Sequence, residues 1–303
     1  MNTPDEPDTN PEPDGTTITS LVTGANTGIG RATARALAER GDRVVFAGRS
    51  ESATRAAMGE IAAATGNDAL EFLSLDLGNL RSVADAVASL IDRDDSIDVL
   101  VANAGVAGQR GETADGFELA FGINHLGHFL FVTELLDHGI LGGRSPDGGP
   151  ARLVVVSSGS HYEAKRIDFD ALRRPTKSVT GLPEYAVSKL ANVLFTQEVA
   201  RRVSADELFA VSLHPGNLIG TDVTRRLPKP LHALMKRVRP SPEVGARTSV
   251  LCATSMEVLA HNGAYYSVEK LKEPSPVATP ELADALWSRS EDWVRPFRAE
   301  TAS

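Results

Sequence analysis

Two segments far apart in the chain carry residue types that could do chemistry together. Residues 23–30 read Thr-Gly-Ala-Asn-Thr-Gly-Ile-Gly, and residues 185–189 read Tyr-Ala-Val-Ser-Lys. Tyr185 and Lys189 are four positions apart, so a helix places both side chains on one face. A phenol has a pKa of about 10, and a nearby ammonium favours the phenolate and lowers that pKa. Such a tyrosine could protonate a developing alkoxide, or deprotonate an alcohol in reverse.

The glycines of the first segment predict a loop that holds a pyrophosphate. Glycine allows positive φ and a close approach of the backbone to a ligand. A helix that starts here offers free N–H groups and the positive end of its dipole. The alternative is a tight strand-to-helix turn that binds nothing. The residues predicted to contact the nucleotide are Thr23, Gly24, Asn26, Thr27, Gly28, Ile29 and Gly30.

The end of the second predicted strand indicates which nucleotide is bound. A free ribose 2′-OH is usually held by an acidic residue in this region. Here Gly48 occupies that place and Arg49 follows it. A guanidinium suits a 2′-phosphate through charge-assisted hydrogen bonds. We therefore predict NADP(H) in preference to NAD(H); the alternative is that Arg49 is an ordinary surface arginine.

Two further polar positions complete a candidate acid/base site. Ser157 and Ser158 end a predicted strand, where the carboxyl ends of parallel strands open toward a ligand. A serine hydroxyl there could stabilise charge on the substrate oxygen, although both serines could simply cap the strand end. Asn124 falls in the middle of a predicted helix, which asparagine tolerates poorly. Its alternative role is a local hydrogen bond.

These residues need a scaffold, and the pattern of the chain predicts one. Short apolar runs alternate with helical segments, as in a parallel sheet with helices on both faces. The sequence predicts an α/β fold, a Rossmann doubly wound parallel sheet of about seven strands. The predicted strands are 18–22, 43–47, 70–75, 99–102, 152–157, 209–214 and 264–267, and the predicted helices are 29–40, 52–64, 80–91, 113–136 and 183–202.

Composition limits the domain organisation and the location. Residues 1–16 are acidic and proline-rich, which predicts a disordered tail, and residues 17–303 are predicted to form one Rossmann-type domain. The net charge of -9 argues against a nucleic-acid binder. We find no signal peptide and no membrane span, so we expect a cytoplasmic protein. The irregular, partly basic segment near 217–242 is either a solvated surface or a lid over the substrate.

The sulfur and imidazole side chains do not predict a metal site. The single Cys252 excludes an internal disulfide and lies in an apolar helical stretch, as a buried core thiol would. His125, His128 and His161 lie near the predicted site but lack metal-ligand spacing. We predict no metal.

The motifs together resemble those of the short-chain dehydrogenase/reductase family. The matching segments are 23–30, Asn103-Ala104-Gly105, Asn124, Ser158, and Tyr185 with Lys189, and they occur in the family's order. The resemblance covers roughly residues 17–290. It is strongest to the retinol dehydrogenase and WW-domain oxidoreductase branch, through residues 124–129, 188–195 and 214–217.

The resemblance implies roles for individual residues. It implies that Asp76-Leu77 contacts adenine, that Asn103-Ala104-Gly105 lines the cofactor, and that Pro215-Gly216 turns beside the nicotinamide. It selects Ser158 over Ser157 and implies a water relay between Asn124 and Lys189, with Lys189 also binding the nicotinamide ribose. It further implies a possible homodimer or homotetramer built on the helices around 113–136 and 183–202.

These observations predict an NADP(H)-dependent oxidoreductase that interconverts a carbonyl and an alcohol, with Tyr185 as proton donor or acceptor. We expect a small apolar carbonyl or alcohol as substrate. One alternative is reduction of a C=C bond, as in protochlorophyllide reductases, and another is a non-catalytic cofactor-binding regulator. The sequence shows neither the N-terminal membrane anchor of many retinol dehydrogenases nor a WW domain, so a substrate delivered in a bilayer is not implied.

Overall fold

One mixed sheet organises the computed structural model, which describes residues 17–216 and 241–298. Its order is β3-β2-β1-β4-β5-β6-β7-β8, and all neighbours are parallel except β7 and β8. The doubly wound Rossmann fold is therefore confirmed, with eight strands because the chain turns back after β7. The strands are β1 Thr19–Thr23, β2 Arg43–Gly48, β3 Leu70–Ser74, β4 Val99–Ala102, β5 Ala151–Val156, β6 Leu208–His214, β7 Tyr265–Ser267 and β8 Lys270–Lys272.

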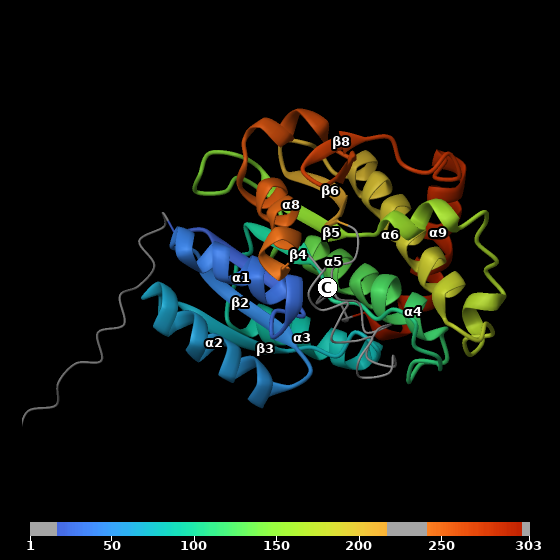
Figure 1. The fold of residues 1–303 in the computed structure, drawn as a ribbon, viewed down its shortest axis with the longest axis horizontal. Helices are drawn as coiled ribbons and strands as arrows, with labels where there is room; N and C mark the ends of the chain where they lie inside the picture. Colours follow the sequence, from blue (N-terminus) through green and yellow to red (C-terminus); the bar gives the residue numbers. More distant parts are fainter. Residues whose placement is uncertain (1–16, 217–240, 299–303) are drawn as a thin grey trace, which may run out of the picture.

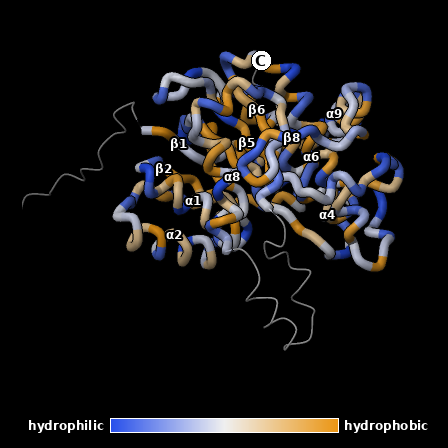
Figure 2. Tube along the Cα trace, turned by 45° about the horizontal axis from the view of Figure 1, so that its top comes forward, coloured by the Kyte–Doolittle hydropathy of each residue, from blue (hydrophilic) through white to orange (hydrophobic). Residues whose placement is uncertain are grey.

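Helices cover both faces of this sheet (Figure 1). Helices α1, α2 and α8 bury apolar side chains on one face, and α3, α5 and α6 do so on the other. The strands between them are mostly hydrophobic (Figure 2). The helices are α1 Gly28–Arg40, α2 Glu51–Thr65, α3 Leu80–Asp92, α4 Leu119–Phe121, α5 Gly127–Asp137, α6 Leu182–Arg202, α8 Pro242–Thr254 and α9 Pro280–Val294, with short turns η1 Gly122–Leu126, η2 Gly159–Glu163, η3 Ala171–Arg173, η5 Glu257–His261 and η6 Arg295–Phe297.

The helix predicted over 113–136 differs from the one observed. Residues 113–118 form a turn instead, in which the Thr113 amide donates to the Phe117 carbonyl and Gly116 has a φ of 75°. The helix begins at Leu119 and contains a π turn, Gly122–Leu126, before α5. Such turns interrupt the regular hydrogen-bond pattern and are frequent at functional sites. Asn124 lies within this one.

Helix α9 is an addition that the sequence analysis did not predict. It packs outside α6, where Trp287 stacks on Phe195 with ring centroids 5.9 Å apart and contacts Phe129 of α5. Its start carries a readable signal, because the Thr279 hydroxyl accepts from the Leu282 amide and a proline follows it. The homodimer or homotetramer expected on the helices around 113–136 and 183–202 stays a prediction.

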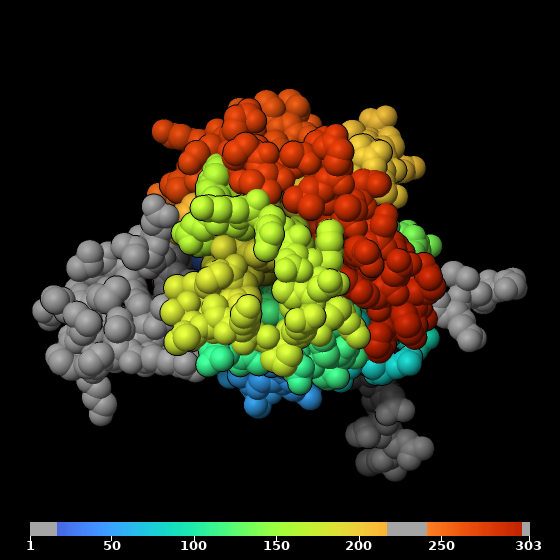
Figure 3. Space-filling view, turned by 90° about the vertical axis from the view of Figure 1, so that its right-hand side faces the viewer, coloured from blue at the N-terminus to red at the C-terminus, as the bar shows by residue number. Residues whose placement is uncertain are grey.

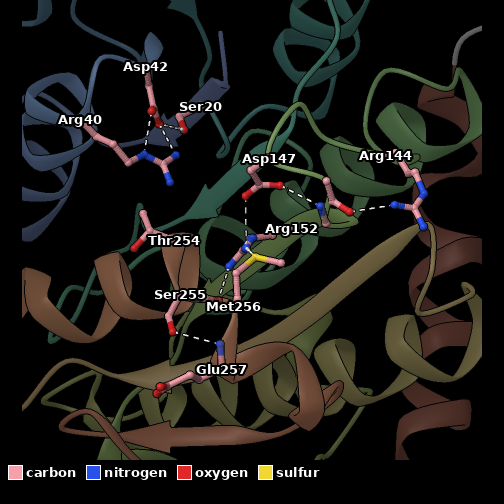
Figure 4. Close-up of polar contacts among 12 residues, drawn as sticks. Ser20, Arg40, Asp42, Arg144, Asp147, Arg152, Thr254, Ser255, Met256 and Glu257 are labelled. Carbon is pink, nitrogen blue, oxygen red and sulfur yellow. Dashed lines mark hydrogen bonds and ion pairs between the residues drawn. The ribbon is translucent and has the colours of Figure 1, made fainter. Parts of the chain in front are cut away.

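The amino-terminal edge of the sheet is closed by buried polar contacts (Figure 4). Arg152, at the start of β5, is 1% exposed, and it donates to the Ser255 carbonyl at 2.7 Å and to Asp147 at 3.4 Å. Asp42, just before β2, is 2% exposed and accepts a hydrogen bond from the Ser20 hydroxyl at 2.6 Å. These contacts satisfy charges that would otherwise be costly to bury.

Several sequence-based expectations concern the chain as a whole. Cys252 is fully buried in α8, where burial raises the pKa of its thiol to about 12, so the core-thiol prediction is confirmed.

One helical stretch of the described residues, Leu119–Asp137, is long and apolar enough to cross a bilayer, but 83% of its most apolar window is buried within the protein. The predicted tail, 1–16, and most of the predicted lid, 217–240, lie outside the described residues.

Candidate active site

The predicted nucleotide loop joins β1 to the exposed start of α1. Gly28 has a φ of 58°, a left-handed conformation that favours glycine. Gly30 is required for another reason, because a Cβ there would lie 2.4 Å from the Asn103 side chain and from the Gly24 carbonyl. Thr27, the N-cap of α1, forms no side-chain capping bond with any described residue. The helix start therefore keeps amide donors for an anion, and this cradle fits a pyrophosphate.

The segment after β4 is bonded directly to this loop. The Asn103 side chain donates to the Thr23 carbonyl at 2.8 Å. The backbone amides of Asn103 and Ala104 both donate to the Thr23 hydroxyl oxygen at 2.9 Å. Gly105 continues toward the centre of the site, and a Cβ there would lie 2.9 Å from the Asn124 side-chain oxygen. The structure thus brings together the predicted residues 23–30 and 103–105.

Asn124 is fully buried, and its side chain is committed to holding neighbouring segments. Its amide nitrogen donates to the Val106 carbonyl at 3.0 Å and to the Ser188 hydroxyl at 2.9 Å. Its side-chain oxygen accepts from the Val106 amide at 2.7 Å. These partners lie 18 and 64 residues away in the sequence, so the side chain joins distant segments and does not form the local hydrogen bond considered as an alternative. The water relay through Asn124 stays a prediction.

Ser158 and Tyr185 meet beyond the carboxyl end of β5. The strand ends at Val156, so Ser157 and Ser158 follow it directly. Burial raises the pKa of Tyr185, and a hydrogen bond with the Ser158 side chain opposes that rise. The direction corrects the sequence-based expectation of a lowered pKa, because the cost of burying a phenolate outweighs the interactions that favour it. The phenol is therefore protonated at neutral pH.

Lys189 lies on the same helix, with its ammonium 5.7 Å from the centroid of the Tyr185 ring. The side chain is only 4% exposed, and burial lowers its pKa to about 7. An ammonium has three donors, and within the described residues the Val156 carbonyl accepts one of them at 2.8 Å. Two donors are left for ligand oxygens. The predicted shared face of Tyr185 and Lys189 is present.

The remaining predicted contacts lie along the same carboxyl edge of the sheet. Arg49 is exposed directly after β2. Asp76 is the second residue after β3, and its side chain accepts from the Gly78 amide at 3.0 Å, while Leu77 is buried. Pro215 and Gly216 follow β6 and are partly buried. These positions are in line with their predicted contacts, and the contacts themselves stay predictions.

Two histidines prove to be part of the site's framework. The His161 side chain donates from Nδ1 to the Ser158 carbonyl at 2.7 Å, and its Nε2 accepts from the Ser275 amide at 3.0 Å. His128 contacts the Thr23 hydroxyl and the Asn124 carbonyl. The sequence placed both near the site but gave no sign of these partners, which lie up to 114 residues away. Within 17–216 and 241–298, no three His, Cys, Asp or Glu side chains gather as a metal site would require.

Comparison with known proteins gives consistent matches. A family model described as short chain dehydrogenase matches residues 19–167. Retinol dehydrogenase 13 of Homo sapiens is 36% identical over 284 residues, covering 90% of this chain and 83% of that protein. The WW domain-containing oxidoreductase of Danio rerio is 38% identical over 285 residues, covering 91% and 68%. A crystal structure of an uncharacterised protein from Mycobacterium paratuberculosis aligns with a TM-score of 0.71 at 29% identity, covering 93% of this chain and 95% of that one.

Proposed function

The chain belongs to the short-chain dehydrogenase/reductase family and is similar to its retinol dehydrogenase and WW-domain oxidoreductase branch, and from this premise we propose that it is an NADP(H)-dependent oxidoreductase. Its reaction interconverts an apolar carbonyl compound and the corresponding alcohol in the cytoplasm. The observation that carries the proposal is the meeting of Ser158, Tyr185 and Lys189 beside the nucleotide loop, at one edge of the sheet.

The side chains divide the chemistry among them. A bound nicotinamide would supply or accept a hydride at its C4 atom. Ser158 orients the substrate oxygen and stabilises charge that develops on it. A free phenol has a pKa of about 10 and burial raises that of Tyr185 further, so the residue carries the proton that it would donate to an alkoxide.

Lys189 and Asn124 serve the proton path and the cofactor. The two remaining donors of Lys189 suit the hydroxyl groups of the nicotinamide ribose and one relay water. The backbone carbonyl of Asn124 lies in the π turn, and we assign it the other end of that relay. The Asn124 side chain keeps residue 106 and Ser188 at their spacing.

The proposed preference for NADP(H) rests on the exposure of Arg49 and on its lack of a carboxylate partner among the described residues. Three neighbouring arginines of this half of the sheet are paired with carboxylates: Arg31 with Glu60, Arg43 with Glu71, and Arg55 with Glu51. Arg49 forms no ion pair or hydrogen bond with any described residue. It is exposed directly after β2, the strand that pairs with β1. A guanidinium in this state is available to a 2′-phosphate.

The substrate side is bordered by apolar side chains. Tyr162 and Leu182 are each 38% exposed, and they flank Ser158 and Tyr185 in the sequence. Figure 3 shows the segments after β5 and into α6, yellow-green, together on one surface beside the red C-terminal segment. This border supports an apolar substrate.

A cofactor-oxidation assay tests the proposal. NADPH and NADH are each offered with aldehydes (retinal among them), ketones, quinones and conjugated alkenes. We expect turnover of apolar carbonyls with NADPH and a clear preference over NADH. Turnover of the alkenes alone would favour C=C reduction, and NADPH binding without any turnover would contradict catalysis.

A further inference from the structure

We propose that His128 is a positioning residue that couples the nucleotide loop to the catalytic centre. It joins the Thr23 hydroxyl, at the end of β1, to the Asn124 carbonyl in the π turn. This inference deepens the proposed function and rests on it. The coupling fixes the spacing between the segment that lines the cofactor and the carbonyl that ends the proton relay.

The hydrogen bonds around Thr23 determine how His128 is protonated. The Thr23 oxygen accepts from the amides of Asn103 and Ala104, both at 2.9 Å, which uses its two acceptor positions. Its own hydrogen must therefore go to Nε2 of His128, which is 2.9 Å away. Nε2 is then an acceptor and Nδ1 carries the ring hydrogen. Nδ1 donates to the Asn124 carbonyl at 3.1 Å.

The surroundings hold the imidazole in this neutral form. His128 is 2% exposed, and burial, together with the nearby charge of Lys189, lowers its pKa to about 4. A neutral ring with one donor and one acceptor matches the two partners it has. Both ring nitrogens are satisfied, so the residue is a defined link and not a filler of space.

Removal of either ring nitrogen of His128 would leave one of its two partners without a hydrogen bond. If Nε2 were removed, the Thr23 hydroxyl would have no acceptor for its hydrogen and would have to rotate toward another group. One of the two partly buried amides it holds, Asn103 or Ala104, would then lose its acceptor. If Nδ1 were removed, the Asn124 carbonyl would lose its side-chain donor where the π turn already interrupts the helix pattern.

His125, three residues earlier, provides a matched comparison. It is also buried and neutral, with a pKa lowered by burial to about 3. However, it packs between Phe121 and Phe195, and its Nε2 contacts the Ser290 hydroxyl of α9 at 3.2 Å. It belongs to the packing of α9, and its hydrogen bond and ring contacts within the described residues are to Ser290 and to aromatic side chains, not to the nucleotide loop. Two buried histidines on one helical stretch thus have different partners.

The test separates the two bonds of His128. His128→Gln keeps an acceptor near the Nε2 position, and His128→Asn keeps a donor near the Nδ1 position. His125→Gln is the control. We measure the Kd of NADPH by fluorescence titration, kcat on the best carbonyl substrate, and the melting temperature. The Kd requires no turnover, so a chain that turns over nothing would contradict the proposed function while the Kd still tests the link to Thr23.

We expect the two variants to differ in opposite ways. His128→Asn should weaken NADPH binding about 10-fold and change kcat less, because the Thr23 hydroxyl loses its acceptor. His128→Gln should lower kcat about 10-fold and leave the Kd within about threefold. His125→Gln should lower only the melting temperature. Equal losses of Kd and kcat in both His128 variants, or values for both that match the control, would overturn the proposal.

Discussion

The two edges of the sheet use the same kinds of polar residue for opposite purposes. At the amino edge, the donors of Arg152 go to the Ser255 carbonyl, Asp147 and a methionine sulfur, and Asp42 is bonded to Ser20. At the carboxyl edge, one of the three donors of Lys189 has an acceptor among the described residues. The start of α1 also has no side-chain cap among the described residues.

The difference separates stability from function. The amino edge satisfies its buried charges with one another, so its residues should matter for folding and little for catalysis. At the carboxyl edge, donors remain available to a ligand, and Lys189 is buried, so its protonated form is destabilised. Features of this kind lower the stability of the protein at the place where a ligand is to be bound. Substitutions on the two edges should therefore change different measured quantities.

The largest effect is expected for Lys189→Met. We expect kcat/KM to fall at least about 10³-fold, because the residue supports both the proton path and the ribose contact. The melting temperature of the cofactor-free protein should stay level or rise, because a buried charge is replaced by an apolar chain of similar length. Activity assays and thermal unfolding of one preparation measure both. A large loss of stability with activity retained would reverse the assignment.

The same lysine predicts a pH dependence of stability. Its pKa falls from 10.5 to about 7 on folding, so between these values the unfolded chain binds more protons than the folded one. The contribution of this group to stability therefore rises with pH through that window and is lost as the pH falls toward 7. Urea unfolding at about pH 7 and about pH 9 measures this. From the lower to the higher pH, the free energy of unfolding should increase more for wild type than for Lys189→Met. An equal response in both proteins would show that Lys189 is not the group responsible.

The next largest effect is expected at the opposite edge, for Arg152→Met. Loss of this buried guanidinium leaves the Ser255 carbonyl without its donor, so the free energy of unfolding should fall by about 3 kcal/mol. Activity per folded molecule should remain within about twofold, because the residue lies at the far edge from the site. Arg35→Met, which removes an exposed pair with Glu39, is the control and should cost less than about 0.5 kcal/mol.

A smaller effect is expected for Arg49→Ala. The KM for NADPH should rise about 10-fold while the KM for NADH stays nearly constant, because only the 2′-phosphate contact is lost. Steady-state kinetics with each cofactor measure this. Arg55→Ala removes an arginine that is already paired with Glu51 and should leave both values unchanged. If the KM values for NADPH and NADH rose equally, Arg49 would not be the residue that contacts the 2′-phosphate.

The fold could be predicted well where a local pattern carries enough information. The strand at Val99–Ala102 has the predicted bounds, because a short buried β-branched run is readable from sequence. The turn before Leu119 was missed, because Gly116 and the Thr113–Phe117 bond override a helical pattern. Helix α9 was not predicted although Thr279 marks its start. Its apolar side chains are stabilised by packing on α6, which the local sequence does not show.

The site could be predicted in residue types but not in energetics. The glycine loop and the tyrosine–lysine pair were found from their spacing together with their places after predicted strands. The distant partners, Thr23 for His128 and Ser275 for His161, could not be predicted, because they lie more than 100 residues away in the sequence. The direction of the Tyr185 pKa was wrong, because burial depends on tertiary packing that the sequence does not display.

The most direct test of the site's assignment to the carboxyl edge is Tyr185→Phe. The change removes one hydroxyl and leaves the ring, so the Kd of NADPH should stay within about threefold and the melting temperature should not fall. The kcat for carbonyl reduction should fall at least about 10³-fold if Tyr185 transfers the proton. Turnover close to wild type, with NADPH still bound, would contradict the account.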